Sequence, residues 1–170
     1  MNNQYQAWIG KQSSTRALVT AYQADALTAT LDRDDPPYKE GDVIPPGWHL
    51  FYIREVVKLR DTAEDGHPKR GDFLPPIDLP RRMWAGTRAT YHKPIHVGEN
   101  ISNVTTIESV TPKVGKTGQL VFLKLKNEIS GEDGLATTEL QDVVYREEAQ
   151  SGVAAPEPPP PPGEAVWKRT

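Results

Sequence analysis

The sequence predicts an α+β domain in which helical segments come first and an antiparallel sheet follows. Two observations support this class. From residue 86 onward, runs rich in β-branched and aromatic residues alternate with glycine-bearing turns, which is typical of strands joined by hairpins. Before that point, apolar residues recur at spacings of three and four, the period of an amphipathic helix. Helices followed by a run of strands indicate an α+β arrangement.

The first helix is predicted over residues 14–32, before the Asp-Asp-Pro-Pro sequence at 34–37. Ser13 or Ser14 is available as its N-cap. Its apolar positions are spaced by three or four residues along one face: Ala17, Ala21, Ala24, Leu27 and Leu31.

The segment at residues 48–60, WHLFYIREVVKLR, carries apolar side chains on nearly every side and is therefore expected to be deeply buried. Its length and its position after Pro45 and Pro46 favour a helix, whereas its β-branched and aromatic residues leave a strand open. We expect a curved sheet to wrap around this segment, because it has too much apolar surface to bury on one side only.

Four strands are predicted, over residues 86–92, 100–111, 118–127 and 137–146. The glycines at residues 113–116 and 130–134 suit tight hairpin turns. In the third strand, every second residue from Val121 to Leu125 is aliphatic, which predicts a sheet with one buried face.

The chain has 170 residues and reads as one domain followed by a tail. We assign residues 1–149 to the domain and 150–163, which hold APEPPPPPG, to an extended proline-rich linker. Residues 164–170 would begin a second half that is missing, or form a disordered tail.

Composition narrows the function classes. The net charge is −3 with lysines and arginines scattered, so nucleic acid is not an expected partner. No cysteine is present, which removes disulfides, thiolate nucleophiles and zinc fingers. No apolar run is long enough to span a membrane and the N-terminus lacks a signal pattern, so we expect no membrane association and a cytoplasmic protein.

The most informative stretch is the connection at residues 65–86, which holds four prolines, three arginines, a histidine and a tryptophan. Proline fixes φ and favours extended geometry at the preceding residue, so the chain should follow a stiff, non-helical path here. Such a path would present Arg81 and Arg82 at a defined place. A guanidinium offers a planar donor fork that matches a carboxylate or a phosphate.

Several short motifs resemble the N-terminal half of the MaoC-like hydratase/dehydratase family. They are WIG at 8–10, PPGWH at 45–49, DGHP at 65–68, FLPP at 73–76, LPRRMWAG at 79–86 and QDVVYR at 141–146. The similarity is to the branch that includes mesaconyl-C4-CoA and itaconyl-CoA hydratases and hydroxyacyl-thioester dehydratases. This resemblance implies a hot-dog fold, in which an antiparallel sheet wraps around a central helix.

The resemblance also implies an activity, the addition or removal of water at the double bond of an acyl-CoA thioester. In the family, the catalytic residues lie in a second hot-dog, in a pattern resembling Asp-x-Asn-Pro-x-His. Here no aspartate is followed five positions later by a histidine. We therefore expect no catalytic residue in this chain, and a MaoC-type catalytic hot-dog domain or subunit as its partner in a homo- or heterodimer. Coenzyme A would be part of the substrate, and no separate cofactor is expected.

Candidate substrate contacts gather in the proline-rich connection: Arg81, Arg82, Trp84, His67 and Arg70. One of the two adjacent arginines could instead cap the loop or pair with Asp72 or Asp78. His67 could be an acid/base or could hydrogen-bond its own turn. Arg70, with Lys69, could meet the phosphates of coenzyme A or be solvated. Trp84 is expected to cover the core or the junction between two hot-dogs, with stacking on adenine as the alternative.

The remaining histidines predict no metal site, because they lack ligand spacing and carboxylate companions. His49 is expected to be a satisfied core residue, whereas His92 and His96 should be solvated. In the last strand, the alternation with Leu140 and Val144 places Asp142 on an apolar face. We expect Asp142 to form a structural ion pair with Arg82 or Arg88, or to mark the edge of the site.

Two other functions remain open at this point. A hot-dog thioesterase would use an acidic residue on the central helix to activate water, and Glu55 is the only one well inside residues 48–60, with Asp61 beyond the end. An assembly subunit would bind acyl-CoA without chemistry. The acyl group and the direction of the reaction are not fixed by the sequence.

Overall fold

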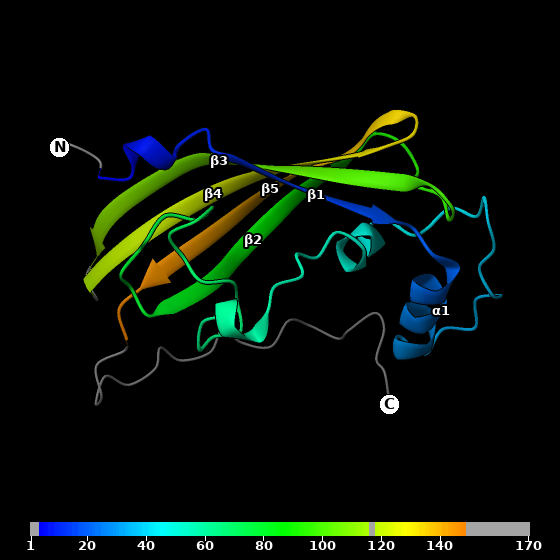
Figure 1. Cartoon of the computed structure of the whole chain (residues 1–170), viewed down its shortest axis with the longest axis horizontal. Coiled ribbons are helices and arrows are strands. Elements are labelled where there is room, and N and C mark those ends of the chain that lie inside the picture. The colour runs from blue at the N-terminus through cyan, green and yellow to red at the C-terminus, as the bar shows by residue number, and fades with distance from the viewer. Residues whose placement is uncertain (1–3, 116–117, 149–170) are drawn as a thin grey trace, which may run out of the picture.

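The computed structural model describes residues 4–115 and 118–148. Its main element is one five-stranded antiparallel sheet with the strand order β1-β3-β4-β5-β2, and one α-helix packs beside it (Figure 1). The bounds are β1 Gln12–Leu18, α1 Ala21–Thr30, β2 Arg81–Tyr91, β3 Asn100–Gly115, β4 Gly118–Gly131 and β5 Gly134–Arg146. The predicted α+β class is confirmed.

All four predicted strands are present, and each extends beyond its predicted range at one end. Strands β3, β4 and β5 follow one another in an antiparallel meander, while β1 and β2 form its two edges. Strand β2 bulges between Trp84 and Gly86, and β3 between Ile107 and Ser109. A bulge bends the strand that carries it, which contributes to the curvature of the sheet.

The helix predicted over residues 14–32 is wrong in its first third. Residues Gln12–Leu18 form β1, which pairs with β3, and helix α1 starts only at Ala21. Thr20, rather than Ser13 or Ser14, is the N-cap, and its side chain accepts a hydrogen bond from the backbone N–H of Gln23 at 3.4 Å. Pairing with β3 stabilises an extended conformation of these residues, which the spacing of Ala17 from Ala21 does not prevent.

The long helix expected over residues 48–60 is also wrong. The chain forms a 3-10 turn at Trp48–Phe51, then an irregular stretch, then a second 3-10 turn at Leu59–Asp61. Only the beginning is buried, since Val56 is 96% exposed and Leu59 is 88% exposed. Gly47 enters the first turn in the left-handed region, with a φ of 87°, and the β-branched and aromatic residues that follow favour a helix weakly.

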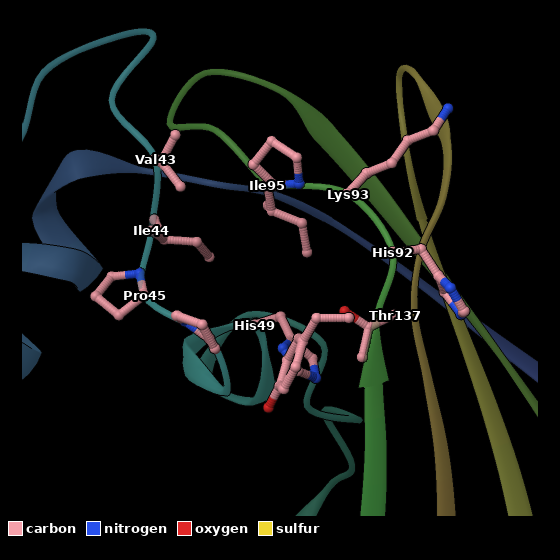
Figure 2. A pocket seen from close by; sticks show the side chains of 11 residues that line it. Val43, Ile44, Pro45, His49, His92, Lys93, Ile95 and Thr137 are labelled. Carbon is pink, nitrogen blue, oxygen red and sulfur yellow. The ribbon is translucent and has the colours of Figure 1, made fainter.

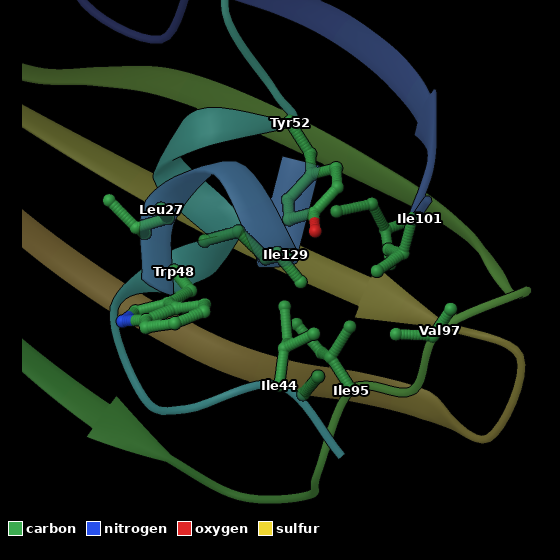
Figure 3. Close-up of a cluster of buried hydrophobic side chains, with 11 residues drawn as sticks. Leu27, Ile44, Trp48, Tyr52, Ile95, Val97, Ile101 and Ile129 are labelled. Carbon is green, nitrogen blue, oxygen red and sulfur yellow. The ribbon is translucent and has the colours of Figure 1, made fainter. Parts of the chain in front are cut away.

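The inner face of the sheet therefore carries two hydrophobic clusters instead of one continuous helix. In the first, α1 and the Trp48 turn pack against the ends of β3 and β4, as Figure 3 shows for Leu27, Trp48, Ile101 and Ile129. In the second, Ile77 and other loop residues cover the opposite end. The buried sheet residues of this second cluster include Ile107, Val110, Val121, Leu123, Leu125, Val143 and Tyr145.

The stiff connection at residues 65–80 thus has a structural task, which is to cover the second cluster. The alternation predicted in β4 is confirmed, because Val121, Leu123 and Leu125 are all buried. None of the helices in the described part of the chain is long and apolar enough to cross a membrane. The predicted linker and the final residues, 150–170, lie outside the described residues.

Candidate functional site

The two adjacent arginines open β2 and point to opposite faces of the sheet. Arg82 pairs in register with Tyr145, whose side chain is buried on the inner face, so Arg82 lies on that face and is half-buried. Arg81 pairs with Arg146, one position along, and is exposed. The rigid connection therefore delivers one arginine, not two, to the inside of the molecule.

Arg82 lines a cavity of about 430 Å³ together with His67, Lys69 and Arg54. Two acidic residues, Glu55 and Asp72, also line it, and the remaining lining residues are Gly66, Pro68, Phe73, Leu74 and Leu125. Within residues 4–115 and 118–148, no side chain forms a hydrogen bond or an ion pair with the guanidinium of Arg82. An arginine that is half-buried and unpaired beside a cavity is well suited to bind an anion.

His67 holds a turn. Its backbone N–H donates to Oδ1 of Asp65 at 3.0 Å, and its ring Nδ1 lies 3.2 Å from the carbonyl oxygen of the same residue. Burial alone would raise the pKa of Asp65, but the His67 hydrogen bond and the positive charges of His67, Arg82 and Arg70 hold that pKa below its usual range. These contacts match the prediction that His67 hydrogen-bonds its own turn. His67 also lines the Arg82 cavity.

Arg70 is engaged by the loop that it belongs to. Its guanidinium donates to the carbonyl oxygens of Ile77 and Leu79, the latter at 2.9 Å, and lies 5.3 Å from the ring centroid of Tyr145. The structure does not bring Arg70 into the cavity. Its neighbour Lys69 does line the cavity, and the Lys69 ammonium donates to the carbonyl oxygen of Arg60 at 2.7 Å.

Trp84 does not cover the core. It pairs in register with the buried Val143, which places it on the inner face, yet it is 71% exposed. Its indole N–H donates to Oγ1 of Thr87 at 3.0 Å. Because β2 is an edge strand, Trp84 lies on a part of the inner face that no described residue covers, which leaves the junction and the stacking alternatives open.

The prediction for Asp142 is confirmed in its partner and wrong in its face. Oδ2 of Asp142 lies 3.0 Å from an Nη atom of Arg88, which gives the expected ion pair. From Thr137 onward, the buried residues of β5 are at odd positions, including Val143 and Tyr145, so Asp142 lies on the outer face. The acidic residue that faces inward is Glu139.

Glu139 forms a buried pair that the sequence did not reveal. Its Oε1 lies 3.1 Å from Nε2 of His49, and the two side chains are 6% and 2% exposed, respectively. The prediction that His49 is a satisfied core residue is confirmed. The odd-numbered alternation of Thr137, Val143 and Tyr145 along β5 was the signal that could have identified Glu139 as inward-facing.

The other two histidines differ from this pair. His92 is exposed, with Nε2 3.0 Å from Oγ1 of Thr138, and His96 is half-buried, with its backbone N–H bonded to Glu99. Across the described residues, no three histidine or acidic side chains are grouped as metal ligands.

Comparison with known proteins identifies the family. The model for hydroxyacyl-thioester dehydratase type 2 matches residues 47–170. The chain belongs to this family. A curated relative, the mesaconyl-C(4)-CoA hydratase of Chloroflexus aurantiacus, is 36% identical over 156 residues, which cover 92% of this chain and 55% of the relative. The chain therefore spans about half the length of that relative, and the resemblance seen in the motifs is confirmed.

Solved structures agree with the fold. One chain of the ChsH1-ChsH2 complex from Mycobacterium tuberculosis superposes with a TM-score of 0.61 at 16% identity, over 86% of this chain and 89% of that one. A chain of the C-terminally truncated HadBC complex, a (3R)-hydroxyacyl-ACP dehydratase from the same organism, gives 0.54 at 16% identity, over 80% and 96%. The expected hot-dog fold is confirmed, with the Trp48 turn and α1 in place of a long central helix.

Proposed function

We propose that this chain is the non-catalytic hot-dog half of an acyl-CoA hydratase/dehydratase that acts on enoyl-CoA or 3-hydroxyacyl-CoA thioesters. The observation that carries the proposal is the match to mesaconyl-C(4)-CoA hydratase over 92% of the chain. That relative makes thioesters of the mesaconyl or itaconyl type the first substrates to test. The half would wall the substrate site and hold one end of the substrate, while a second hot-dog supplies the chemistry.

The absence of a recognised acid/base motif supports the non-catalytic assignment. Hydration needs a base that activates water and an acid that protonates the α-carbon, both close to the thioester. The Asp-x-Asn-Pro-x-His pattern does not occur in the sequence. His49 lines a different cavity from Arg82 (Figure 2), and its Nε2 is hydrogen-bonded to the buried carboxylate of Glu139.

Arg82 is the residue that we assign to substrate binding. The thioester offers phosphates on coenzyme A and, in dicarboxylic acyl groups, a free carboxylate. Each can accept two parallel hydrogen bonds from one guanidinium. Lys69 and Arg54 line the same cavity and add positive charge, whereas Arg81 on the outer face and Arg70 in the loop are not placed for this contact.

The edge strand β2 is the surface that we assign to the partner hot-dog. Among the described residues, its eleven residues pair with a strand on one side only, so the other row of backbone donors and acceptors can pair with a strand of a partner. Beside that row, Trp84 and Tyr91 are exposed large aromatic side chains, 71% and 48%, respectively. ChsH1-ChsH2 and HadBC are both named as complexes, which fits a two-part assembly.

The thioesterase alternative is not supported by the position of Glu55. It requires Glu55 on a central helix, but Glu55 lies in the irregular stretch after the Trp48 turn and is exposed. Glu55 does line the Arg82 cavity, where it is one of two carboxylates.

The test is a hydration assay with mesaconyl-C4-CoA, in which loss of the enoyl-thioester absorbance is followed. The chain is assayed alone and with a MaoC-type hot-dog that contains Asp-x-Asn-Pro-x-His. We expect turnover only in the mixture, and turnover by the chain alone would refute the non-catalytic assignment. Binding of the CoA ester without turnover in any mixture would instead support the assembly subunit.

Two variants of β2 distinguish a loss of substrate binding from a general effect of removing an arginine from this strand. Arg82→Gln removes the inner-face guanidinium, and loss of one charge-assisted contact worth about 1.5–3 kcal/mol should weaken binding roughly 10- to 100-fold. Arg88→Gln is the matched control, because Arg88 lies on the outer face of the same strand. Equal effects of the two variants would contradict the assignment of Arg82.

A further inference from the structure

The outer face of the sheet carries a row of positive charges across strands β2, β5, β4 and β3, which lie side by side (Figure 1). Arg81 of β2 and Arg146 of β5 are direct partners in the register, and Lys113 of β3 lies in the same cross-strand row. Arg81 is exposed and Arg146 is half-buried. Because like charges directly opposite each other destabilise a sheet, this row costs stability unless an anion meets it.

The acidic side chains near this row are engaged elsewhere. Asp142 lies directly opposite Lys124 in the register but pairs with Arg88, at 3.0 Å. The carboxylate of Glu147 accepts a hydrogen bond from a backbone N–H at 3.2 Å. Within residues 4–115 and 118–148, no ion pair involves Arg81, Arg146, Lys113 or Lys124. Since the net charge of the chain is −3, this excess of positive charge is local.

A hollow of about 410 Å³ opens on the same face. Lys113 and Lys124 line it, together with the hydroxyl-bearing Ser109 and Thr111 and the ring of Phe122. The Lys113 ammonium lies 4.9 Å from the centroid of that ring. The remaining lining residues are Ala85, Leu123, Asp142 and Val143. A carboxylate that enters the hollow would therefore meet two ammonium groups and two hydroxyl donors.

Apolar side chains lie beside the positive charges. Met83, Val144 and Phe122 form the next cross-strand row, two positions along each strand from the arginine row. Met83 is 44% exposed and Phe122 is 37% exposed. Arginine, methionine and aromatic residues are enriched at protein–protein interfaces. Their combination on one face is typical of an interaction surface.

The spacing of the charges sets the shape of the partner. Neighbouring strands lie about 4.8 Å apart, so the arginines on β2 and β5 are roughly 10 Å from the two lysines on β3 and β4. A small anion could reach only one of these two groups. Two turns of an α-helix rise about 10.5 Å over seven residues. Acidic residues seven positions apart on a helix would reach both groups.

We propose that this outer face docks an acidic helical segment of a partner protein. One carboxylate would lie at the Arg81–Arg146 pair, a second between Lys113 and Lys124, and an apolar side chain between them on Phe122. The apolar residues of this surface lie within strands rather than at a loop tip, so a protein suits the face better than the interior of a membrane does. The surface goes beyond the proposed function, because it uses neither the inner face nor the free edge of β2.

The experiment measures fluorescence anisotropy of a labelled, alanine-rich helical peptide that carries two glutamates seven positions apart and a leucine between them. The purified full chain is titrated into it. We expect a dissociation constant in the micromolar range that rises as sodium chloride is added, because salt screens the charges. A twin peptide with glutamines in place of the glutamates should bind at least tenfold more weakly.

Variants of the chain locate the binding. Arg81→Gln and Lys124→Gln should each weaken the glutamate peptide about tenfold, since each removes a charge-assisted contact. Arg16→Gln is the matched control, because Arg16 is exposed on the outer face of β1, at the opposite edge of the sheet, and should change binding less than twofold. Arg81→Gln should also be at least as stable to urea as the parent, because it removes a like-charge pair.

Four results would overturn the proposal. They are equal binding of the glutamate and glutamine peptides, equal effects of Arg81→Gln and Arg16→Gln, loss of stability in Arg81→Gln, or binding to vesicles of anionic phospholipid without binding to the peptide, which would make the face a membrane surface. Hydration by the mixture with a MaoC-type hot-dog should be the same for Arg81→Gln and the parent. Failure of the docking surface and failure of the proposed function are therefore distinguishable.

Discussion

Replacing Glu139 by leucine is expected to destabilise the fold by about 3–5 kcal/mol, because it leaves His49 buried without its partner. The magnitude follows from burial. The two side chains are 6% and 2% exposed and lie 3.1 Å apart, so water cannot replace the lost carboxylate. The histidine must then either remain unsatisfied in the interior or move, with its turn, away from the sheet.

The double variant His49→Leu with Glu139→Leu should be far less damaging than the single one. Removing both members leaves no orphaned polar group, and apolar replacements of a buried pair are often neutral or stabilising by about 1–4 kcal/mol. The matched control is Asp142→Leu on the same strand. The side chains of Arg88 and Asp142 are 64% and 32% exposed, respectively, so loss of this ion pair should change the free energy of unfolding by less than about 1 kcal/mol.

Urea unfolding followed by tryptophan fluorescence measures all three variants. With a denaturant slope of about 2 kcal/mol per molar, the single Glu139 variant should lower the unfolding midpoint by roughly 1.5–2.5 M. A loss below about 1 kcal/mol, or a double variant as unstable as the single one, would show that the pair is not the buried unit that the structure describes.

Three further predictions concern stability and use the same unfolding assay. Tyr145→Phe should change the free energy of unfolding by less than about 0.5 kcal/mol, because the buried Tyr145 hydroxyl forms no hydrogen bond with the described residues. Tyr52→Phe should lower it by about 1 kcal/mol, because the Tyr52 hydroxyl donates to the carbonyl oxygen of Thr20 at 3.0 Å. Arg70→Gln should cost about 1.5–3 kcal/mol, since the guanidinium bonds two loop carbonyls; a smaller loss would place Arg70 outside the loop framework. The pKa of Asp65 is lower in the folded state, so its carboxylate stabilises the fold above about pH 4 and this contribution is lost as the pH falls further; Asp65→Asn should therefore be less stable than the parent at pH 7 and equal to it near pH 2, and a difference that persists in acid would contradict the sign.

The sheet was predictable because its signals are local. Alternation in β4 and β5 and the glycines of the two hairpins are sufficient to define three consecutive strands, and short hairpins limit how these strands can pair. The first edge strand was missed because its stability comes from pairing with β3, about ninety residues away. A run such as Ser13 to Ala17 has no strong preference of its own, and tertiary contacts decide its conformation.

The segment at residues 48–60 was misread for a different reason. Apolar residues on every side indicate burial only when they are in a regular element, and Val56 and Leu59 turn out to be exposed in an irregular one. The proline-rich connection supplies the apolar cover, through Ile77 and Leu79, that the missing helix was expected to give. The motifs of this connection identified the family. Which face of the sheet Arg81 and Arg82 occupy could be determined only from the register of β2 against β5.

The stability of the leucine double variant decides what maintains the buried His49–Glu139 pair. If the leucine double variant is as stable as the parent, then the His49–Glu139 pair is not maintained by its contribution to folding, since apolar residues would serve equally well. If instead the double variant is clearly less stable than the parent, the pair contributes to folding through the buried contact at 3.1 Å, and it has the structural role that its burial indicates.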